Sequence, residues 1–269
     1  MLAILRGVLA AAVILVVGQI PLGLFLTMNL RWSPSIPWIL PATAGTLWFF
    51  FRYLNGDGWP ASTSEKRRHL LRSRALPARI WFWSLAAGVV GMTSAMCLAF
   101  ITIRITRLSQ RSLDAPLDFS NLPFPTVLAV LAAIALTAGV VEEVAFRGYL
   151  ISLIEERHGW IIAFLLSALL FFAAHLSHAY ASLAFVPFFL AHCAILTLLV
   201  YFTRSILPSI VIHAVSDFIV LPIQYGLIGQ RLPASLAPYV VVAILCALAA
   251  VPVYRQLANA VRKSCESPH

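Results

Sequence analysis

The sequence predicts an all-α, polytopic membrane bundle of about eight transmembrane helices. Its composition is 61% hydrophobic and 11% charged, and its mean hydropathy is +0.91. Soluble domains carry about 45–50% apolar and about 25% charged residues, so this chain has more apolar surface than a globular core can bury. A crossing needs about 20 residues, and 269 residues therefore hold about eight crossings with short loops. Each crossing is expected to be a helix, because lipid offers the backbone no hydrogen-bond partners.

Eight apolar runs follow one another along the chain. They cover residues 2–27, 36–54, 80–103, 124–154, 160–176, 181–202, 206–223 and 236–257. The first run is too long for the core of a signal peptide and is expected to be an uncleaved span. Pro123 and Pro125 suit a helix entry, and a turn is expected at 156–159. The predicted organisation is three N-terminal helices in 1–123, a four-helix core in 124–223, and a last helix with a basic tail in 224–269.

Positive charge is concentrated in one loop, residues 55–79. The chain has a net charge of +9, and this loop carries Lys66, Arg67, Arg68, Arg72, Arg74 and Arg79. The positive-inside rule assigns such a loop to the cytoplasm, and counting spans from it assigns both termini to the same side. The next loop argues against this orientation, although two acids offset part of its charge. It carries Arg104, Arg107, Arg111, Asp114 and Asp118.

The charge pattern also bears on partners and location. Because the positive residues lie between apolar runs, they are expected to meet lipid headgroups, and the bilayer rather than nucleic acid is the predicted partner. The pattern fits a bacterial inner membrane and an endoplasmic reticulum membrane, and the compact loops favour the bacterial one.

Three charged residues lie inside the fourth apolar run: Glu142, Glu143 and Arg147. A charge at mid-membrane costs about 2.5–3.5 kcal/mol on insertion scales, so each is expected to have a partner or a function. Glu143 and Arg147 are four residues apart on one helical face and can form an ion pair, which in one interpretation only locks two helices together. Glu142 is rotated by about 100° from Glu143 and is left to face another group.

Two further runs bring ionisable residues to the depth of Glu142. Glu142 lies about 15 residues before the turn of the helical hairpin and His175 about 17 after it, so their depths differ by about 3 Å. His213 and Asp217 share a face of the seventh run, about 10 and 16 Å from the cytoplasmic end, and Glu142 is about 18 Å deep. The candidate catalytic residues are therefore Glu142, His175, His213 and Asp217, with Glu143 and Arg147 as supporting residues.

A carboxylate and two imidazoles can catalyse hydrolysis in two ways. Glu142, His175 and His213 form a set that can hold Zn²⁺ with an open position for water. Without a metal, Glu142 and His175 can polarise water as a general base while other groups stabilise the oxyanion. The sequence has no HExxH motif, CxxC pair, serine nucleophile elbow or nucleotide fingerprint, which excludes those enzyme classes. His178 is interpreted as an interfacial residue. His192, about 17 Å from the cytoplasmic end, is interpreted as a hydrogen-bonded packing residue, with a supporting residue of the site or an extra ligand as alternatives.

Three motifs resemble those of the CPBP family, which comprises intramembrane proteases related to the CAAX prenyl endopeptidase and to bacteriocin-processing or immunity proteins. They are Glu142-Glu143-x-x-x-Arg147, Phe171-x-x-x-His175 and His213-x-x-x-Asp217, in this order on three apolar runs. The resemblance covers about residues 126–219. It implies an eight-helix bundle with an internal cavity open to the membrane and the cytoplasm, and a catalytic core within 124–223. It also implies a CAAX-type endopeptidase, metal-dependent or metal-free, that cuts a membrane-tethered and in some members prenylated peptide.

The resemblance also implies roles for the motif residues. Glu142 and His175 would activate the attacking water, while His213 and Asp217 would stabilise the oxyanion or help to hold a metal. The family's third motif usually ends in Asn, and an ionised Asp217 cannot donate to an oxyanion. Asp217 would therefore be protonated, bind metal, or orient His213. Two other functions stay open: a non-catalytic membrane peptide-binding or immunity protein of the same family, and a proton-coupled transporter.

Overall fold

The computed structural model describes residues 2–107, 117, 119, 121–177, 182–225, 227 and 235–266. Within this part the chain is all-helical, which confirms the predicted fold class. The predictions for Arg111, Asp114, Asp118 and His178 lie outside the described residues.

The helices follow the predicted apolar runs closely. In chain order they are α1 (Leu2–Trp32), α2 (Ile39–Leu54), the 3-10 helix η1 (Ala61–Thr63), α3 (Ser64–Leu71), α4 (Ala78–Thr106), α5 (Phe124–Thr137), the π-helices η3 (Ala138–Glu142) and η4 (Val144–Leu150), α6 (Ile151–Ala174), the 3-10 helix η5 (Leu183–Phe185), α7 (Val186–Thr203), α8 (Leu207–Gln224) and α9 (Ala237–Glu266). The basic segment 55–79, expected as a loop, contains η1 and α3.

The protein is an integral membrane protein with six helical segments long and apolar enough to cross a bilayer among the described residues. One of the six, Phe124–Ala174, has 51 residues and contains a break at Gly159, whose φ of 77° and ψ of 165° are not helical. The chain reverses there, because Glu142 and His175 on either side of the break are in contact. This segment therefore supplies two of the predicted crossings, and the 16-residue α2 supplies a shorter apolar helix.

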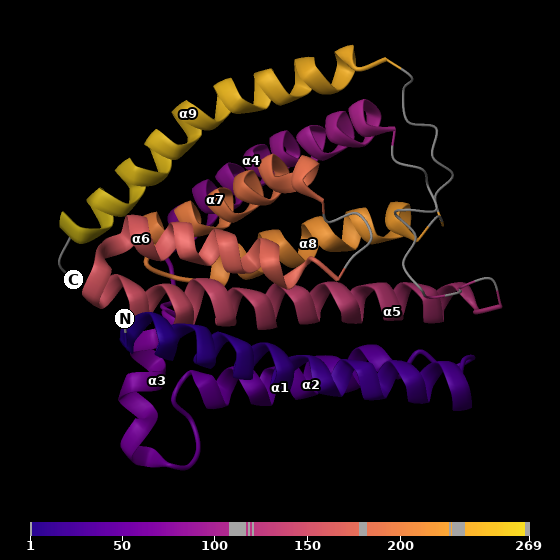
Figure 1. The fold of residues 1–269 in the computed structure, drawn as a ribbon. Coiled ribbons are helices and arrows are strands. Elements are labelled where there is room, and N and C mark those ends of the chain that lie inside the picture. The colour runs from indigo at the N-terminus through magenta and orange to yellow at the C-terminus, as the bar shows by residue number, and fades with distance from the viewer. Residues whose placement is uncertain are drawn as a thin grey trace.

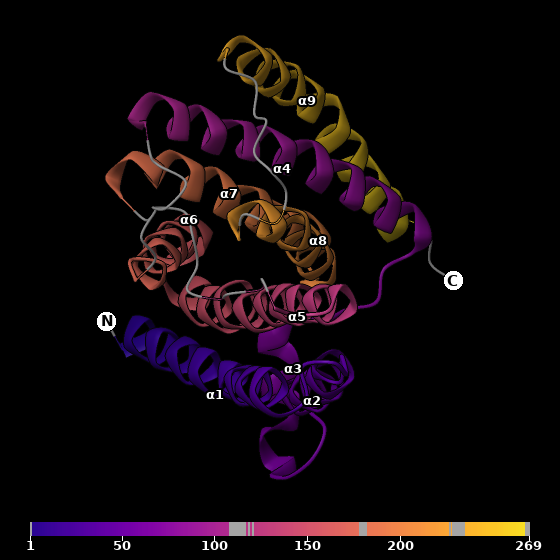
Figure 2. The same cartoon turned by 90° about the vertical axis from the view of Figure 1, so that its right-hand side faces the viewer.

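The bundle is arranged in layers (Figures 1 and 2). Helices α1 and α2 form one outer layer, α4 and α9 form the opposite one, and α5 to α8 lie between them. The outer helices expose large apolar side chains: Val13 of α1 is 60% exposed and Leu248 of α9 is 65% exposed. In water such surfaces would aggregate, whereas in a bilayer they meet lipid. The middle layer is shielded from both sides, which makes it the part of the bundle where charged groups can be kept from lipid.

One end of the bundle is held together by ion pairs around Glu155 of α6. Arg72, directly after α3, lies 2.8 Å from Glu155, and Arg204, directly after α7, lies 3.4 Å from it. The Ile206 N–H also donates to the Arg72 carbonyl at 2.9 Å. The basic segment, the break at Gly159 and the α7–α8 turn therefore share one end, where α1 begins and α9 ends (Figure 1).

Candidate active site

The predicted site begins on the π-helical segment of the middle layer. Residues 138–150 form the π-helices η3 and η4, which carry Glu142, Glu143 and Arg147 around their junction. A π-helix bonds i to i+5 rather than i to i+4 and is frequent at functional sites. Gly139 allows this segment to approach α8, because a Cβ there would stand 2.9 Å from the Ile210 carbonyl oxygen and 2.7 Å from the Ala214 Cβ. The close approach brings the two glutamates to the level of His213.

Glu143 has two partners in a fully buried environment: it forms an ion pair with Arg147 and a hydrogen bond with His213. Its Oε1 lies 3.0 Å from Nη1 of Arg147 and 2.8 Å from Nδ1 of His213, and neither Glu143 nor Arg147 is exposed. The predicted ion pair is thus present, and it includes a contact to α8 that helical spacing alone did not predict. Because a carboxylate paired with arginine accepts hydrogen bonds, the Nδ1 of His213 carries a proton and its Nε2 faces the other way. Glu143 therefore sets both the tautomer and the ring orientation of His213.

His175 is held in a matching way at the end of α6. Its Nδ1 lies 2.8 Å from the Phe171 carbonyl oxygen. A carbonyl can only accept, so Nδ1 carries the proton and the Nε2 of the neutral ring offers a lone pair. The Phe171 ring packs against both histidines, with its centroid 4.6 Å from that of His175 and 6.3 Å from that of His213. The guanidinium of Arg147 lies 4.5 Å from the Phe171 centroid, so this ring joins the supporting ion pair to the histidines.

Glu142 lies between the two imidazoles. Its Oε2 is 4.0 Å from Nε2 of His175 and 3.8 Å from Nε2 of His213. These separations are too long for direct hydrogen bonds. The oxygen is buried and has no hydrogen-bond partner among the described residues. A carboxylate oxygen and a lone-pair nitrogen that face each other at this spacing suit a group that donates to both, such as water, or a cation.

Asp217 stands on the open side of His213. Its Oδ2 lies 3.6 Å from the Nε2 of His213, the same nitrogen that faces Glu142, while Nδ1 is taken by Glu143. Glu143, and not Asp217, therefore orients His213 through Nδ1 in this geometry. Asp217 is left on the side where water, substrate or a metal would be bound.

Exposure increases in steps across the site. The side-chain values are 0% for Glu143 and Arg147, 3% for His213, 13% for Glu142, 17% for His175 and 28% for Asp217. Glu143, Arg147 and His213 are sealed, whereas Glu142, His175 and Asp217 are partly accessible. Two cavities of about 320 and about 870 Å³ lie elsewhere in the bundle, and neither is lined by these residues.

His192 of α7 is a site neighbour that the sequence analysis interpreted as a packing residue. It is buried, and its ring stacks on Phe171 at a centroid distance of 5.5 Å and lies 5.0 Å from the His213 ring. Neither of its ring nitrogens has a hydrogen-bond partner among the described residues. Its depth in the sixth apolar run was the signal that linked it to the site.

Glu142, His175 and His213 offer the atom types that bind zinc, but the distances between these atoms are too long for zinc coordination. Two imidazole nitrogens and a carboxylate oxygen are common zinc ligands, bound at about 2.0–2.2 Å. Tetrahedral coordination at these lengths separates ligand atoms by about 3.4 Å, and the nearest pairs here are 3.8 and 4.0 Å apart. Among the described residues, no three His, Cys, Asp or Glu side chains stand close enough together to qualify as a metal site. The Glu142–His175 and Glu142–His213 separations would each have to shorten by about half an ångström to reach this spacing.

The fold and the site together define a polytopic membrane protein with a Glu–His–Arg cluster in its middle layer. Residues 124–219 match the family model Rce1-like, described as type II CAAX prenyl endopeptidase Rce1-like. This part of the chain is an Rce1-like domain of the CPBP family, and the resemblance inferred from the three motifs is confirmed. The match extends from the first residue of α5 into α8 and includes all three motifs. No curated protein and no solved structure matches the chain.

Proposed function

We propose that the protein is an intramembrane endopeptidase that hydrolyses a peptide bond of a membrane-tethered protein or peptide. One observation carries the proposal: Glu142 Oε2 lies within 4.0 Å of the Nε2 atoms of both His175 and His213, whose Nδ1 atoms are already bonded. This spacing accommodates a water molecule that Glu142 and His175 can orient and deprotonate. The Rce1-like domain supports the same reaction class.

In the proposed reaction, Glu142 and His175 orient and deprotonate the attacking water. The Glu142 carboxylate accepts the proton as the water oxygen bonds to the scissile carbonyl carbon. His213, in its protonated form, donates from Nε2 to the oxyanion, and the negative charge of Glu143 at Nδ1 stabilises that form. The proton held by Glu142 then passes to the leaving amine as the carbon–nitrogen bond breaks.

Glu143 and Arg147 act as positioning residues in this scheme. The ion pair keeps Glu143 charged in a site with no exposure, and the charged carboxylate fixes the His213 ring. Zn²⁺, if the protein uses it, would be held by Glu142, His175 and His213 and would lower the pKa of a bound water.

The test compares wild type with Glu142→Gln, His175→Ala and His213→Ala in detergent. Cleavage of a mixed library of membrane-tethered peptides, including prenylated ones, is measured by mass spectrometry. Each variant should lose about 10²–10⁴-fold in rate, the usual contribution of a general base or its partner. Glu156→Gln is the matched control, because Glu156 is half exposed and its one ion pair among the described residues is with His69 at the surface.

A zinc chelator distinguishes the metal-dependent reaction from the metal-free one. Loss of wild-type cleavage that added Zn²⁺ restores would assign Glu142, His175 and His213 as metal ligands, whereas full activity in chelator supports the metal-free reaction. Wild type that is folded yet cuts no peptide in the library would contradict the proposal and favour a peptide-binding protein without catalysis. Unchanged cleavage by Glu142→Gln would contradict the assigned mechanism.

A further inference from the structure

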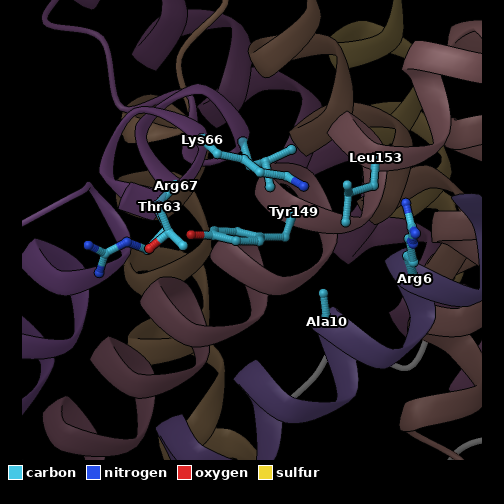
Figure 3. Close-up of a pocket in the computed structure, with 8 residues that line it drawn as sticks. Arg6, Ala10, Thr63, Lys66, Arg67, Tyr149 and Leu153 are labelled. Carbon is cyan, nitrogen blue, oxygen red and sulfur yellow. The ribbon is translucent and has the colours of Figure 1, made fainter. Parts of the chain in front are cut away.

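A basic cavity lies at the end of the bundle that carries α3, away from the candidate active site. It has a volume of about 320 Å³ and is lined by residues of α1, η1, α3, η4 and α6 (Figure 3). These residues are Arg6, Ala10, Thr63, Lys66, Arg67, Leu70, Tyr149 and Leu153. Three of the eight are cationic and none is acidic. The size is at the lower end of the range for small-molecule sites, about 300–1,000 Å³.

The three cations have different partners. Arg67 is a structural residue: its guanidinium donates to the carbonyls of Tyr53 at 2.7 Å and Gly58 at 3.1 Å, and it lies over the Tyr53 ring. No ion pair or hydrogen bond joins Arg6 or Lys66 to another described residue. In Figure 3 the Lys66 amine reaches over the Tyr149 ring towards Leu153, and Arg6 approaches from α1 on that side. Two unpaired cations on separate helices therefore face one cavity.

The walls of the cavity are apolar and firmly held. The Tyr149 hydroxyl donates to the Leu54 carbonyl at 3.1 Å, so its ring is fixed as a wall. Ser152, one turn further, donates to the Leu70 carbonyl at 3.0 Å and clamps α6 to α3. Ala10 and Leu153 complete an apolar surface beneath the two cations. This combination suits a ligand with a negative head and an apolar continuation better than a free anion.

Lipid is available at this position. Helix α1 is an outer helix, and Leu5 and Leu9, which flank Arg6, are 55% and 56% exposed. Arg6 is in the second turn of α1, at the end of the bundle where the basic segment lies (Figure 1). A cation there is at the level of lipid headgroups rather than of acyl chains.

We propose that this cavity is a binding site for an anionic phospholipid, whose headgroup phosphate is held between Arg6 and Lys66 and whose glycerol and first acyl carbons pack on Ala10, Tyr149 and Leu153. The bound lipid joins α1 to α3, and Ser152 clamps α3 to α6, which directly follows η4 with Arg147. Binding thus stabilises the position of η4 and α6, two of the elements that carry the candidate active site. The inference is independent of the catalytic proposal.

The experiment measures lipid binding by native mass spectrometry of the full-length protein in detergent. Dioleoylphosphatidylglycerol, dioleoylphosphatidylcholine and inorganic phosphate are titrated separately. Wild type should bind the first phosphatidylglycerol more tightly than phosphatidylcholine. Each cation is expected to strengthen binding about fivefold. Arg6→Gln/Lys66→Gln should therefore raise the Kd for the first phosphatidylglycerol about 25-fold. Phosphatidylcholine carries the same phosphate beside a cationic choline, so its binding should fall by much less, and the preference for phosphatidylglycerol should be lost.

The matched control is Arg79→Gln/Arg157→Gln, which removes two exposed positive charges at the same end but outside the cavity. It should retain selectivity for phosphatidylglycerol. An equal loss in both double variants would overturn the proposal in favour of diffuse surface charge. Ala10→Leu adds bulk without changing charge and should also weaken phosphatidylglycerol binding. An unchanged Kd for phosphatidylglycerol in this variant would show that the lipid does not bind in the cavity. Displacement of the lipid by millimolar inorganic phosphate would identify a free-anion site instead.

Discussion

His213 contacts two carboxylates that are neighbours in the sequence, each through a different ring nitrogen. Glu143 accepts a hydrogen bond from Nδ1 and is ion-paired with Arg147 with no exposure, while Glu142 faces Nε2 at 3.8 Å and is 13% exposed. Oε2 of each glutamate has no hydrogen-bond partner among the described residues. The two side chains therefore differ in ion pairing and exposure. Removing one partner of a buried ion pair leaves the other charge uncompensated, which applies to Glu143 and Arg147.

We expect neutralising the two glutamates to have opposite effects on stability. Glu143→Gln leaves Arg147 charged in a site with no exposure and should lower the free energy of unfolding by about 3–5 kcal/mol. Glu142→Gln removes a charge that lacks a hydrogen-bond partner, so stability should be unchanged or higher while cleavage is lost. Thermal unfolding in detergent, alongside the peptide assay, measures both. A large destabilisation by Glu142→Gln would contradict the division of roles.

Removing both members of the buried Glu143–Arg147 pair distinguishes its contribution to stability from its contribution to catalysis. Glu143→Gln/Arg147→Met leaves no unpaired charge and should recover most of the stability lost in Glu143→Gln. Cleavage should stay low, because His213 lacks the carboxylate that fixes its Nδ1 proton. Recovery of full activity in the double variant would show that the pair is only a helix lock.

We expect His192→Phe to be tolerated. A phenyl ring keeps the stacking on Phe171 and His213 and removes two buried nitrogens that have no hydrogen-bond partner in the described part of the chain. The midpoint of thermal unfolding should be equal or higher, and the cleavage rate should remain within about threefold of wild type, well short of the loss expected for a general base. A loss as large as that of His175→Ala would instead make His192 a member of the reacting set.

The π-helical segment is the element on which the site depends. Glu142 and Glu143 both reach His213 because η3 lies against α8 without a side chain between them at Gly139. The same segment is packed from the other side by α1, where a Cβ at Gly18 would stand 2.7 Å from Val141. Gly139 thus lets η3 approach the backbone of α8, and Gly18 leaves room for the Val141 side chain against α1, as small residues do at other membrane helix interfaces.

Gly139→Ala should damage the site through packing alone. The added Cβ would meet the Ile210 carbonyl oxygen at 2.9 Å, and backbone cannot move aside as a flexible side chain does. We expect a loss of about 1–3 kcal/mol in the free energy of unfolding, as for overpacked cores, and a much lower cleavage rate because η3 and α8 separate. Gly23→Ala on α1 is the matched control, since its Cβ would meet nothing within 4 Å. Equal effects of the two substitutions would argue against a close-approach role for Gly139.

The whole bundle has one basic end, and we propose that this end faces the cytoplasm of a bacterial cell. Segment 55–79, the break at Gly159 and the α7–α8 turn share this end, and the start of α9 lies at the other (Figure 1). In a cysteine-free background, Ser62→Cys should be protected from a membrane-impermeant maleimide in spheroplasts, and Ser235→Cys should react. Both residues are exposed in the structure. The reverse pattern would invert the proposed topology and put both termini outside.

The sequence by itself determined the membrane class, the positions of the helices and the residues that meet in the middle layer. Hydropathy depends on the residues within one segment, and equal rise per residue brings Glu142, His175 and His213 to one depth without further information. Glu143–Arg147 followed in the same way, from spacing within one helix. The three motifs in order were specific enough to indicate the family, which the match over residues 124–219 confirms.

Only the tertiary structure decided which atoms face one another. The π-helix, the assignment of Glu143 to Nδ1 of His213, and the cavity between Arg6 and Lys66 each depend on how closely separate helices approach. That distance is set by glycines and by side chains far apart in the chain, whereas the periodicity of a sequence describes one helix at a time. The sequence therefore specified the members of the site, and the packing of the bundle specified how they contact one another.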